Sequence, residues 1–232
     1  MEKLFEEKLQ LWFENVVEKC NIIGETINLD YYPFQCAKSS LKENVDLLII
    51  GANPGGANPY RKRNTEELFN SSDGINNAYI AESNNDKWKI NKPILEIFKE
   101  PKLHNLLEEA IVMNVIYFNT QNVSNLCDKK EAVECCISLT KEFIYEIIRP
   151  KVVLVLGLKD APKWLGIKYS TTDNSILRTT DNKTGLIMKV NYNNIPHYII
   201  HHPSRNHKFN HNTNLDLKKE LFQKEFEKIF QF

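Results

Sequence analysis

Two short polar segments hold the residues of this chain that are best suited to chemistry. The first is GANPGG, residues 51–56, which comes after the apolar run LLII and is followed by Arg61, Lys62 and Arg63. The second is HHPSRN, residues 201–206. A glycine-lined corner followed by positive charge suits a nucleotide phosphate, a metal-bound substrate or a nucleic-acid base.

The elements that position these segments can be read from hydrophobic patterning. Four short apolar runs predict buried strands at residues 45–50, 111–118, 152–156 and 197–201. An edge strand is expected at 186–190. Helical periodicity appears at 3–20, 93–98, 102–110, 129–148, 161–165 and 215–230, and residues 60–92 read as a long loop with a short helix around 66–69. Strands that alternate with helices predict a single α/β domain over residues 1–232. It has a central four-stranded, mostly parallel sheet flanked by helices, and residues 1–40 form an N-terminal helical extension packed on it.

The strand ends predict where a ligand binds. In open parallel sheets, ligands bind beyond the carboxyl ends of the strands. Both polar segments begin at such ends, Asn114 lies late in the second predicted strand, and Asn119 and Gly157 directly follow the second and third strands. We therefore expect these residues to gather at one edge of the sheet.

Two nucleotide-binding motifs are absent. A phosphate-binding P-loop needs a glycine-rich turn followed at fixed spacing by Lys and then Ser or Thr, which GANPGGANPYRK lacks. Its prolines also remove backbone N–H donors. The GxGxxG dinucleotide fingerprint is missing as well.

A metal site is a weaker candidate. His207 and His211 stand four residues apart, and His201 and His202 come shortly before them. That stretch is poor in helix formers, and no carboxylate or Cys lies nearby to complete a hydrolytic ligand set. We predict no metal and no cofactor, and a metal-dependent hydrolase stays as a third alternative.

The two segments resemble the signature motifs of the uracil-DNA glycosylase superfamily. They are closest to the mismatch-specific and single-strand-selective branches, whose motifs read GxNPG and HPSPRN. Asn114, in VMNVIYF, falls where that superfamily has the Asn that reads uracil. The motifs cover about twenty residues, and their order and their positions after strands agree.

The resemblance implies a monofunctional DNA glycosylase that hydrolyses the N-glycosidic bond of uracil, or of a related damaged base, in base-excision repair. His202 would donate a hydrogen bond to uracil O2, aided by backbone N–H groups near Ala52. Asn53 would hold the attacking water, and since an amide cannot take up a proton, hydrolysis would be slower than with an Asp. Asn114 would match uracil O4 and N3–H and mismatch cytosine.

The resemblance also implies DNA contacts around these motifs. An aromatic side chain should stack on the flipped base, and we prefer Phe69 over Tyr60. Arg205 would fill the space that the base vacates. The remaining predicted DNA-binding residues are Arg61, Lys62, Arg63, Ser204 and Asn206, with contacts to phosphates that do not read sequence.

Three departures from the family pattern keep an alternative open. The second motif lacks the proline that usually follows the serine. A second Asn-Pro pair, at Asn58, leaves the register of Asn53 open. The formal net charge is zero, although residues 182–215 contain no acidic residue and carry five of the six histidines. The alternative is a catalytically inactive protein on the same fold that binds nucleic acid or a nucleobase.

Composition bounds the class of protein. With 42% hydrophobic residues in 232, the chain can bury a sizeable core. It has no apolar run of the roughly 20 residues that span a membrane, and its start is too charged for a signal peptide. The five cysteines form no CxxC pair. We expect a cytoplasmic monomer with reduced thiols, DNA as its partner and no membrane association.

Overall fold

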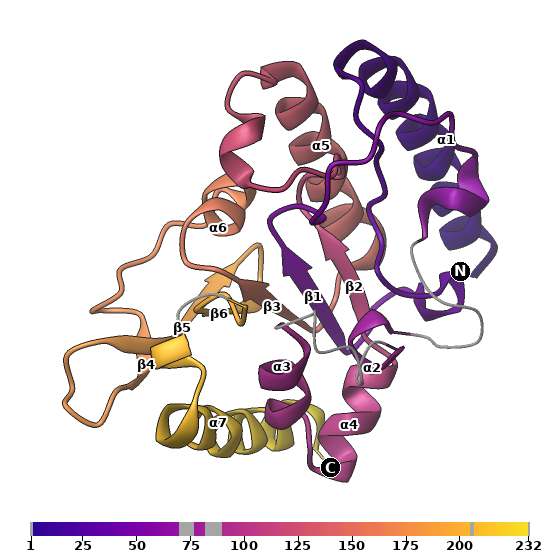
Figure 1. Ribbon diagram of the computed structural model, residues 1–232. Helices are drawn as coiled ribbons and strands as arrows, with labels where there is room; N and C mark the ends of the chain where they lie inside the picture. The colour runs from indigo at the N-terminus through magenta and orange to yellow at the C-terminus, as the bar shows by residue number, and fades with distance from the viewer. Residues whose placement is uncertain (1, 70–76, 82–89, 205–206, 232) are drawn as a thin grey trace.

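A six-stranded mixed sheet lies between two layers of helices in the computed structural model, which describes residues 2–69, 77–81, 90–204 and 207–231 (Figure 1). The strand order is β2-β1-β3-β6-β5-β4. The strands are β1 (Leu47–Gly51), β2 (Ile111–Asn114), β3 (Val152–Leu156), β4 (Ser175–Arg178), β5 (Gly185–Tyr192) and β6 (Ile195–Ile200).

The four strands β2, β1, β3 and β6 are parallel and form the centre of the core. Their apolar runs are buried on both faces, as continuous hydrophobic strands require. From β1 the chain goes to β2 on one side and then crosses to β3 on the other side. The carboxyl ends of β1 and β3 therefore flank the point where the strand order reverses, which is where open α/β sheets bind ligands.

The expected count of four strands is wrong, because β5 and β4 extend the sheet in antiparallel fashion. The predicted edge strand at 186–190 belongs to β5, which is interior because β4 pairs with its free side. β4 is the edge strand. Its short sequence SILR is only partly buried and irregularly paired, so it carries little hydrophobic signal.

The second strand is shorter than the predicted 111–118, since β2 ends at Asn114. Beyond it, the backbone N–H groups of Val115 and Ile116 donate to the carbonyls of Gly51 and Ala52, at 3.0 and 2.9 Å. The chain thus leaves the ladder to bond the turn that follows β1.

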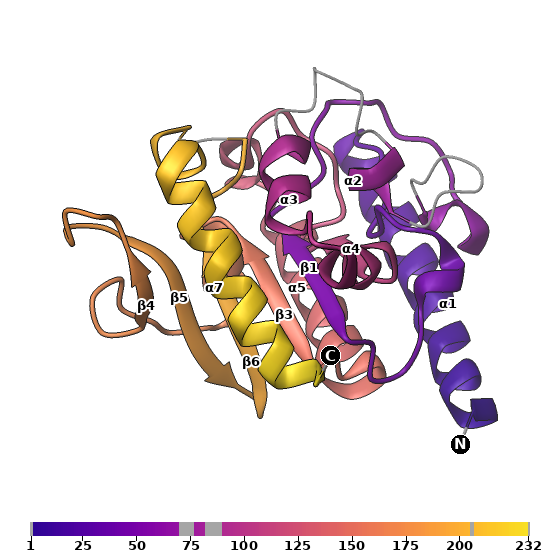
Figure 2. The same ribbon diagram turned by 90° about the horizontal axis from the view of Figure 1, so that it is seen from below.

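Helices cover both faces of the sheet (Figures 1 and 2). One face carries α3 (Asn91–Ile97), α4 (Pro101–Glu108) and α7 (Asn212–Phe230), and the other carries α1 (Glu2–Ile27) and α5 (Lys130–Glu142), which continues as a π-helical turn to Ile148. The remaining helices are the short α2 (Ala78–Ala81) and α6 (Asp160–Leu165).

The N-terminal extension packs on the core through α1. Trp12 is buried, and its Nε1 donates a hydrogen bond to the carbonyl of Leu139 in α5, at 2.9 Å. In the predicted loop 60–92, a 3-10 turn spans Thr65–Leu68 with Asn64 as its N-cap, and residues 70–76 and 82–89 lie outside the described residues.

None of the helices in the described ranges combines the length and the apolar character that a membrane span needs.

The fold contains a buried histidine that should weaken it in acid. His197 in β6 is fully buried; its Nδ1 lies 2.8 Å from the carbonyl of Ile195, and its Nε2 lies 3.2 Å from the Tyr145 hydroxyl. Burial lowers the pKa of His197 to about 4. In the unfolded chain it is about 6.5, so the unfolded state binds the proton more tightly.

We therefore predict that His197 costs the protein stability as pH falls from about 6.5 towards 4, by up to about 1.4 kcal/mol per pH unit. Urea unfolding of the wild type and of His197→Gln at several pH values measures this. The difference in unfolding free energy should shift against the wild type over that window. Parallel pH curves would contradict it.

Candidate functional site

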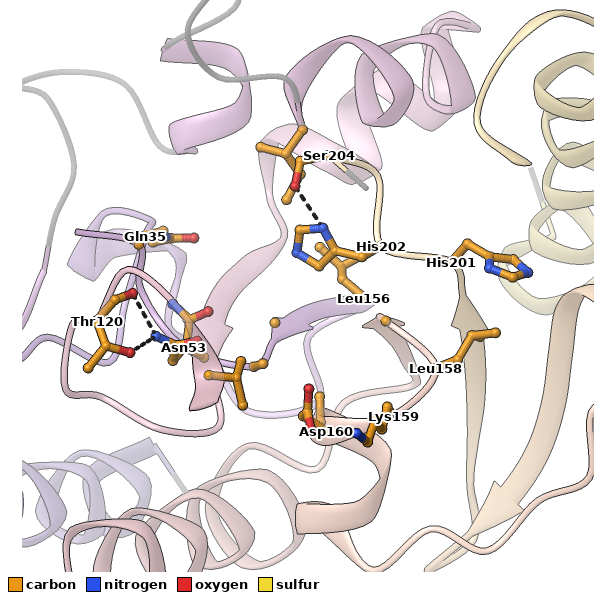
Figure 3. A pocket seen from close by; sticks show the side chains of 18 of the residues that line it. Gln35, Asn53, Thr120, Leu156, Leu158, Lys159, Asp160, His201, His202 and Ser204 are labelled. Carbon is orange, nitrogen blue, oxygen red and sulfur yellow. Dashed lines mark hydrogen bonds between the residues drawn. The ribbon is translucent and has the colours of Figure 1, made fainter. Parts of the chain in front are cut away.

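A cavity of about 820 Å³ opens at the carboxyl ends of the parallel strands. Gly51 and Asn114 end β1 and β2, Leu156 ends β3, and His202 comes just after β6; all four line the cavity. Figure 3 shows Leu156 and His202 on its wall. The polar segments predicted to meet at one edge of the sheet do so. The wall also includes Ala52 and Asn53.

Asn53 is half-buried and held by its amide nitrogen. Its Nδ2 donates to Oγ1 of Thr120 at 2.9 Å and lies 3.3 Å from the carbonyl of the same residue (Figure 3). The Thr120 hydroxyl in turn donates to the carbonyl of Asn122, at 2.9 Å. Since the described hydrogen bonds of the Asn53 side chain all start from Nδ2, its Oδ1 is the atom available to accept a bond from a water.

The two Asn-Pro pairs of the first segment lie differently with respect to the cavity. Asn58 is exposed and is not part of the cavity wall, whereas Asn53 is. Tyr60 is also directed elsewhere, because its hydroxyl donates to Oδ1 of Asn21 in α1, at 3.3 Å.

Asn114 lies beside Gly51 in the parallel register of β2 and β1. Its side chain is 4% exposed, and its Nδ2 has no hydrogen-bond partner within the described part of the chain. A Cβ at Gly51 would stand 2.7 Å from Asn114 Oδ1, so only glycine leaves room for this amide. Because buried donors are nearly always paired, the unpaired N–H group on a cavity wall points to a ligand acceptor.

The imidazole ring of His202 is hydrogen-bonded to the side chain of Ser204. Its Nδ1 lies 2.9 Å from the Ser204 Oγ (Figure 3). When the hydroxyl donates this bond, the ring proton is on Nε2, and the neutral imidazole can donate to a ligand. Ser204, predicted to bind DNA, thus orients the histidine.

His201 also lines the cavity, and its buried Nδ1 has no hydrogen-bond partner in the described part of the chain, but the rest of its ring packs against neighbouring residues. Its ring stacks on Phe209, with centroids 4.2 Å apart, and its Nε2 lies 2.9 Å from the carbonyl of Gly185. Figure 3 shows it directed away from His202. Burial lowers the pKa of His201, which keeps the ring neutral.

Arg63 is buried in an ion pair and is not available to a phosphate. Its Nε and Nη2 donate to the two carboxylate oxygens of Asp30, at 2.6 and 2.7 Å, and the exposed fractions of the two residues are 7% and 4%. Arg61 and Lys62 are exposed. Arg61 lies 3.6 Å from carboxylate oxygens of Asp30 and Glu67.

Phe69 is partly buried and packs against the hydrophobic core. Its ring stacks on Phe34, with centroids 4.9 Å apart and planes 12° apart, and it does not line the cavity. The aromatic side chains of the wall are Tyr32, Tyr79 and Phe209. Arg205 and Asn206, both predicted to bind DNA, lie outside the described residues.

Sequence reasoning missed several polar residues of the wall, namely Gln35, Thr120, Gln121, Lys159 and Asp160. Lys159 lies between β3 and α6, Asp160 is the first residue of α6, and Gln35 comes from the segment that pairs with β2. Asp160 is the one carboxylate that lines the described cavity. No motif marks these residues, although their position beyond β3 was a usable signal for Lys159 and Asp160.

The described side chains include no cluster of three or more His, Cys, Asp or Glu that could hold a metal ion. His211 is exposed. The metal-dependent hydrolase therefore has no ligand set in the described part of the chain.

A comparison of the sequence with protein-family models and with curated proteins finds no match.

The buried ion pair predicts which arginine matters for stability. Arg63→Met leaves the Asp30 carboxylate buried without its partner, so we expect the unfolding free energy to fall by about 3–5 kcal/mol. Arg61→Met, in the same segment but exposed, should cost less than about 1 kcal/mol. Urea denaturation of both variants tests this, and equal losses would show that the buried pair is not the cause.

Proposed function

We propose that this protein is a monofunctional DNA glycosylase that hydrolyses the N-glycosidic bond of uracil, or of a closely related base, in DNA. The observation that carries the proposal is the convergence of Asn53, Asn114 and His202 on one cavity from three separate strand ends. These are the positions that match the uracil-DNA glycosylase motifs.

The reaction needs stabilisation of opposite charges. Cleavage of the bond between deoxyribose and uracil leaves positive charge on the sugar and negative charge on the departing base. His202 donates from Nε2 to the O2 of the base, together with the backbone N–H of Ala52, where that negative charge develops. Ser204 keeps the ring turned for this role.

Asn53 holds the attacking water through Oδ1, because Thr120 fixes its Nδ2. A neutral amide orients this water without taking its proton, so the chemical step is slower than with a carboxylate at this position.

Asn114 recognises the base. Its unpaired Nδ2 donates to O4 of uracil and its Oδ1 accepts from N3–H, whereas cytosine has a donor where uracil has O4. Since Phe69 stacks on Phe34 and does not line the cavity, the base stacks on Tyr32 or Tyr79 of the cavity wall.

Arg61 and Lys62 are exposed on the segment after the first motif and bind phosphates of the strand. Zero net charge and the Asp160 carboxylate on the wall are unfavourable to a long duplex contact. These two features favour a single-stranded substrate. They also support the alternative function, a non-catalytic binder of a nucleobase on the same fold.

The first test is cleavage of a single-stranded oligonucleotide that carries one uracil, under single-turnover conditions with EDTA present. We expect alkali-labile product from the wild type, and a loss of about 10²–10⁴ in rate for His202→Ala and Asn53→Ala. Tight binding without product from the wild type would favour the non-catalytic binder. Loss of activity in the presence of EDTA would contradict a metal-independent mechanism.

A second prediction concerns the space beside Asn114. Gly51→Ala places a methyl carbon only 2.7 Å from Asn114 Oδ1, so the amide must move and base recognition is lost. We expect excision at saturating DNA to fall by about 10-fold or more, by the cost of misplacing a reacting group. Gly55→Ala is the matched control in the same motif, because a Cβ there meets nothing within 4 Å. Similar losses in both variants would argue against the steric explanation.

A further inference from the structure

A buried lysine lies behind the histidine of the second motif. Lys218 in α7 is 0% exposed and forms no ion pair with a carboxylate in the described part of the chain. Its Nζ donates to the carbonyl of Phe209 at 2.7 Å and to Oδ1 of Asn210 at 2.6 Å. Both distances are shorter than the usual N–H···O separation of about 2.9–3.0 Å.

Asn210 links Lys218 to the backbone of His202. While its Oδ1 accepts from Lys218, its Nδ2 donates to the backbone carbonyl of His202 at 3.0 Å. Asn210 is itself buried, so neither bond competes with water. Two hydrogen bonds therefore connect Lys218 in α7 to the backbone of His202, with the Asn210 side chain between them.

A second contact ties the same segment to the sheet. Phe209, whose carbonyl accepts from Lys218, stacks on His201 and lines the cavity. Both ends of the stretch between His202 and Asn210 are therefore anchored, one to β6 and the other to α7.

A lysine at this buried position is unfavourable for the stability of the fold. Burial lowers the pKa of Lys218 to about 7, since a charged amine loses its hydration there. An apolar side chain of similar size avoids this cost, so stability alone does not account for a lysine here.

We propose that Lys218 is a positioning residue for His202: through Asn210 it fixes the backbone that aims the imidazole into the cavity. The inference rests on the proposed function for its effect on rate. Lys218 is fully buried and is not one of the residues that line the cavity, so it is not itself available to a phosphate. Its loss therefore slows the chemical step and leaves DNA binding unchanged.

The test compares Lys218→Met with Lys224→Met, which removes an exposed lysine from the same helix. Single-turnover excision is measured across DNA concentrations, to separate the maximal rate from the half-saturating concentration. We expect Lys218→Met to lower the maximal rate by about 10- to 100-fold, as misplaced catalytic groups do, with half-saturation within about threefold. Lys224→Met should behave as the wild type.

The effect must also depend on His202. In a His202→Ala background, Lys218→Met should produce no further loss, because the two residues act as one unit. An equal loss in both backgrounds, an unchanged maximal rate, or a change in half-saturation alone would overturn the proposal.

Asn210→Ala is the second variant, for the case that Lys218→Met fails to fold. It keeps the lysine and removes the bond to the His202 carbonyl, so it should show the same loss of rate. Full activity of a folded Asn210→Ala protein would overturn the proposal.

NMR separates failure of this inference from failure of the proposed function. The imidazole signals of His202, assigned by their absence in His202→Ala, should shift in Asn210→Ala and stay fixed in Lys224→Met. If the wild type excises no uracil, the proposed glycosylase function is wrong. The NMR signals of His202 then still test whether Lys218 positions this histidine. Unshifted signals overturn the proposal.

Discussion

The parallel pairing of β1 with β2 is the constraint on which the rest of the site depends. It sets Gly51 against Asn114, and the missing Cβ leaves the space that the Asn114 amide occupies. Just beyond, two backbone hydrogen bonds from Val115 and Ile116 fasten the turn that carries Asn53. A slip of this register by one residue would turn Asn114 to the opposite face of the sheet, because side chains alternate along a strand.

The N-terminal helix α1 holds the segment that follows this turn. Oδ1 of Asn21 in α1 accepts from the backbone N–H of Arg63 at 3.0 Å, and its Nδ2 donates to the Arg63 carbonyl at 2.9 Å. The guanidinium of Arg63 in turn donates to the carboxylate of Asp30. The segment after the first motif is therefore fixed by buried polar contacts, and its neighbours Arg61 and Lys62 stay at the surface.

Features that depend on neighbouring residues can be predicted from the sequence, whereas contacts between residues far apart in the sequence cannot. β1 and β3 are readable because each is a continuous apolar run. The positions of Asn53 and His202 are readable because each follows such a run, and that of Asn114 because it interrupts one. The burial of Arg63 is not readable, since its partner Asp30 is far away in the sequence. The same holds for Phe69 against Phe34, and for β4, whose pairing with β5 compensates for weak hydrophobicity.

The strand order also determines when the cavity can exist during synthesis. β1 pairs with β3 across about a hundred residues, and β6 joins only afterwards. Contacts so distant in sequence form slowly, and a growing chain exposes its unpaired strands until they do. His202 and the helix behind it come late in the chain, so a ribosome-bound intermediate would have its first motif made but no complete site.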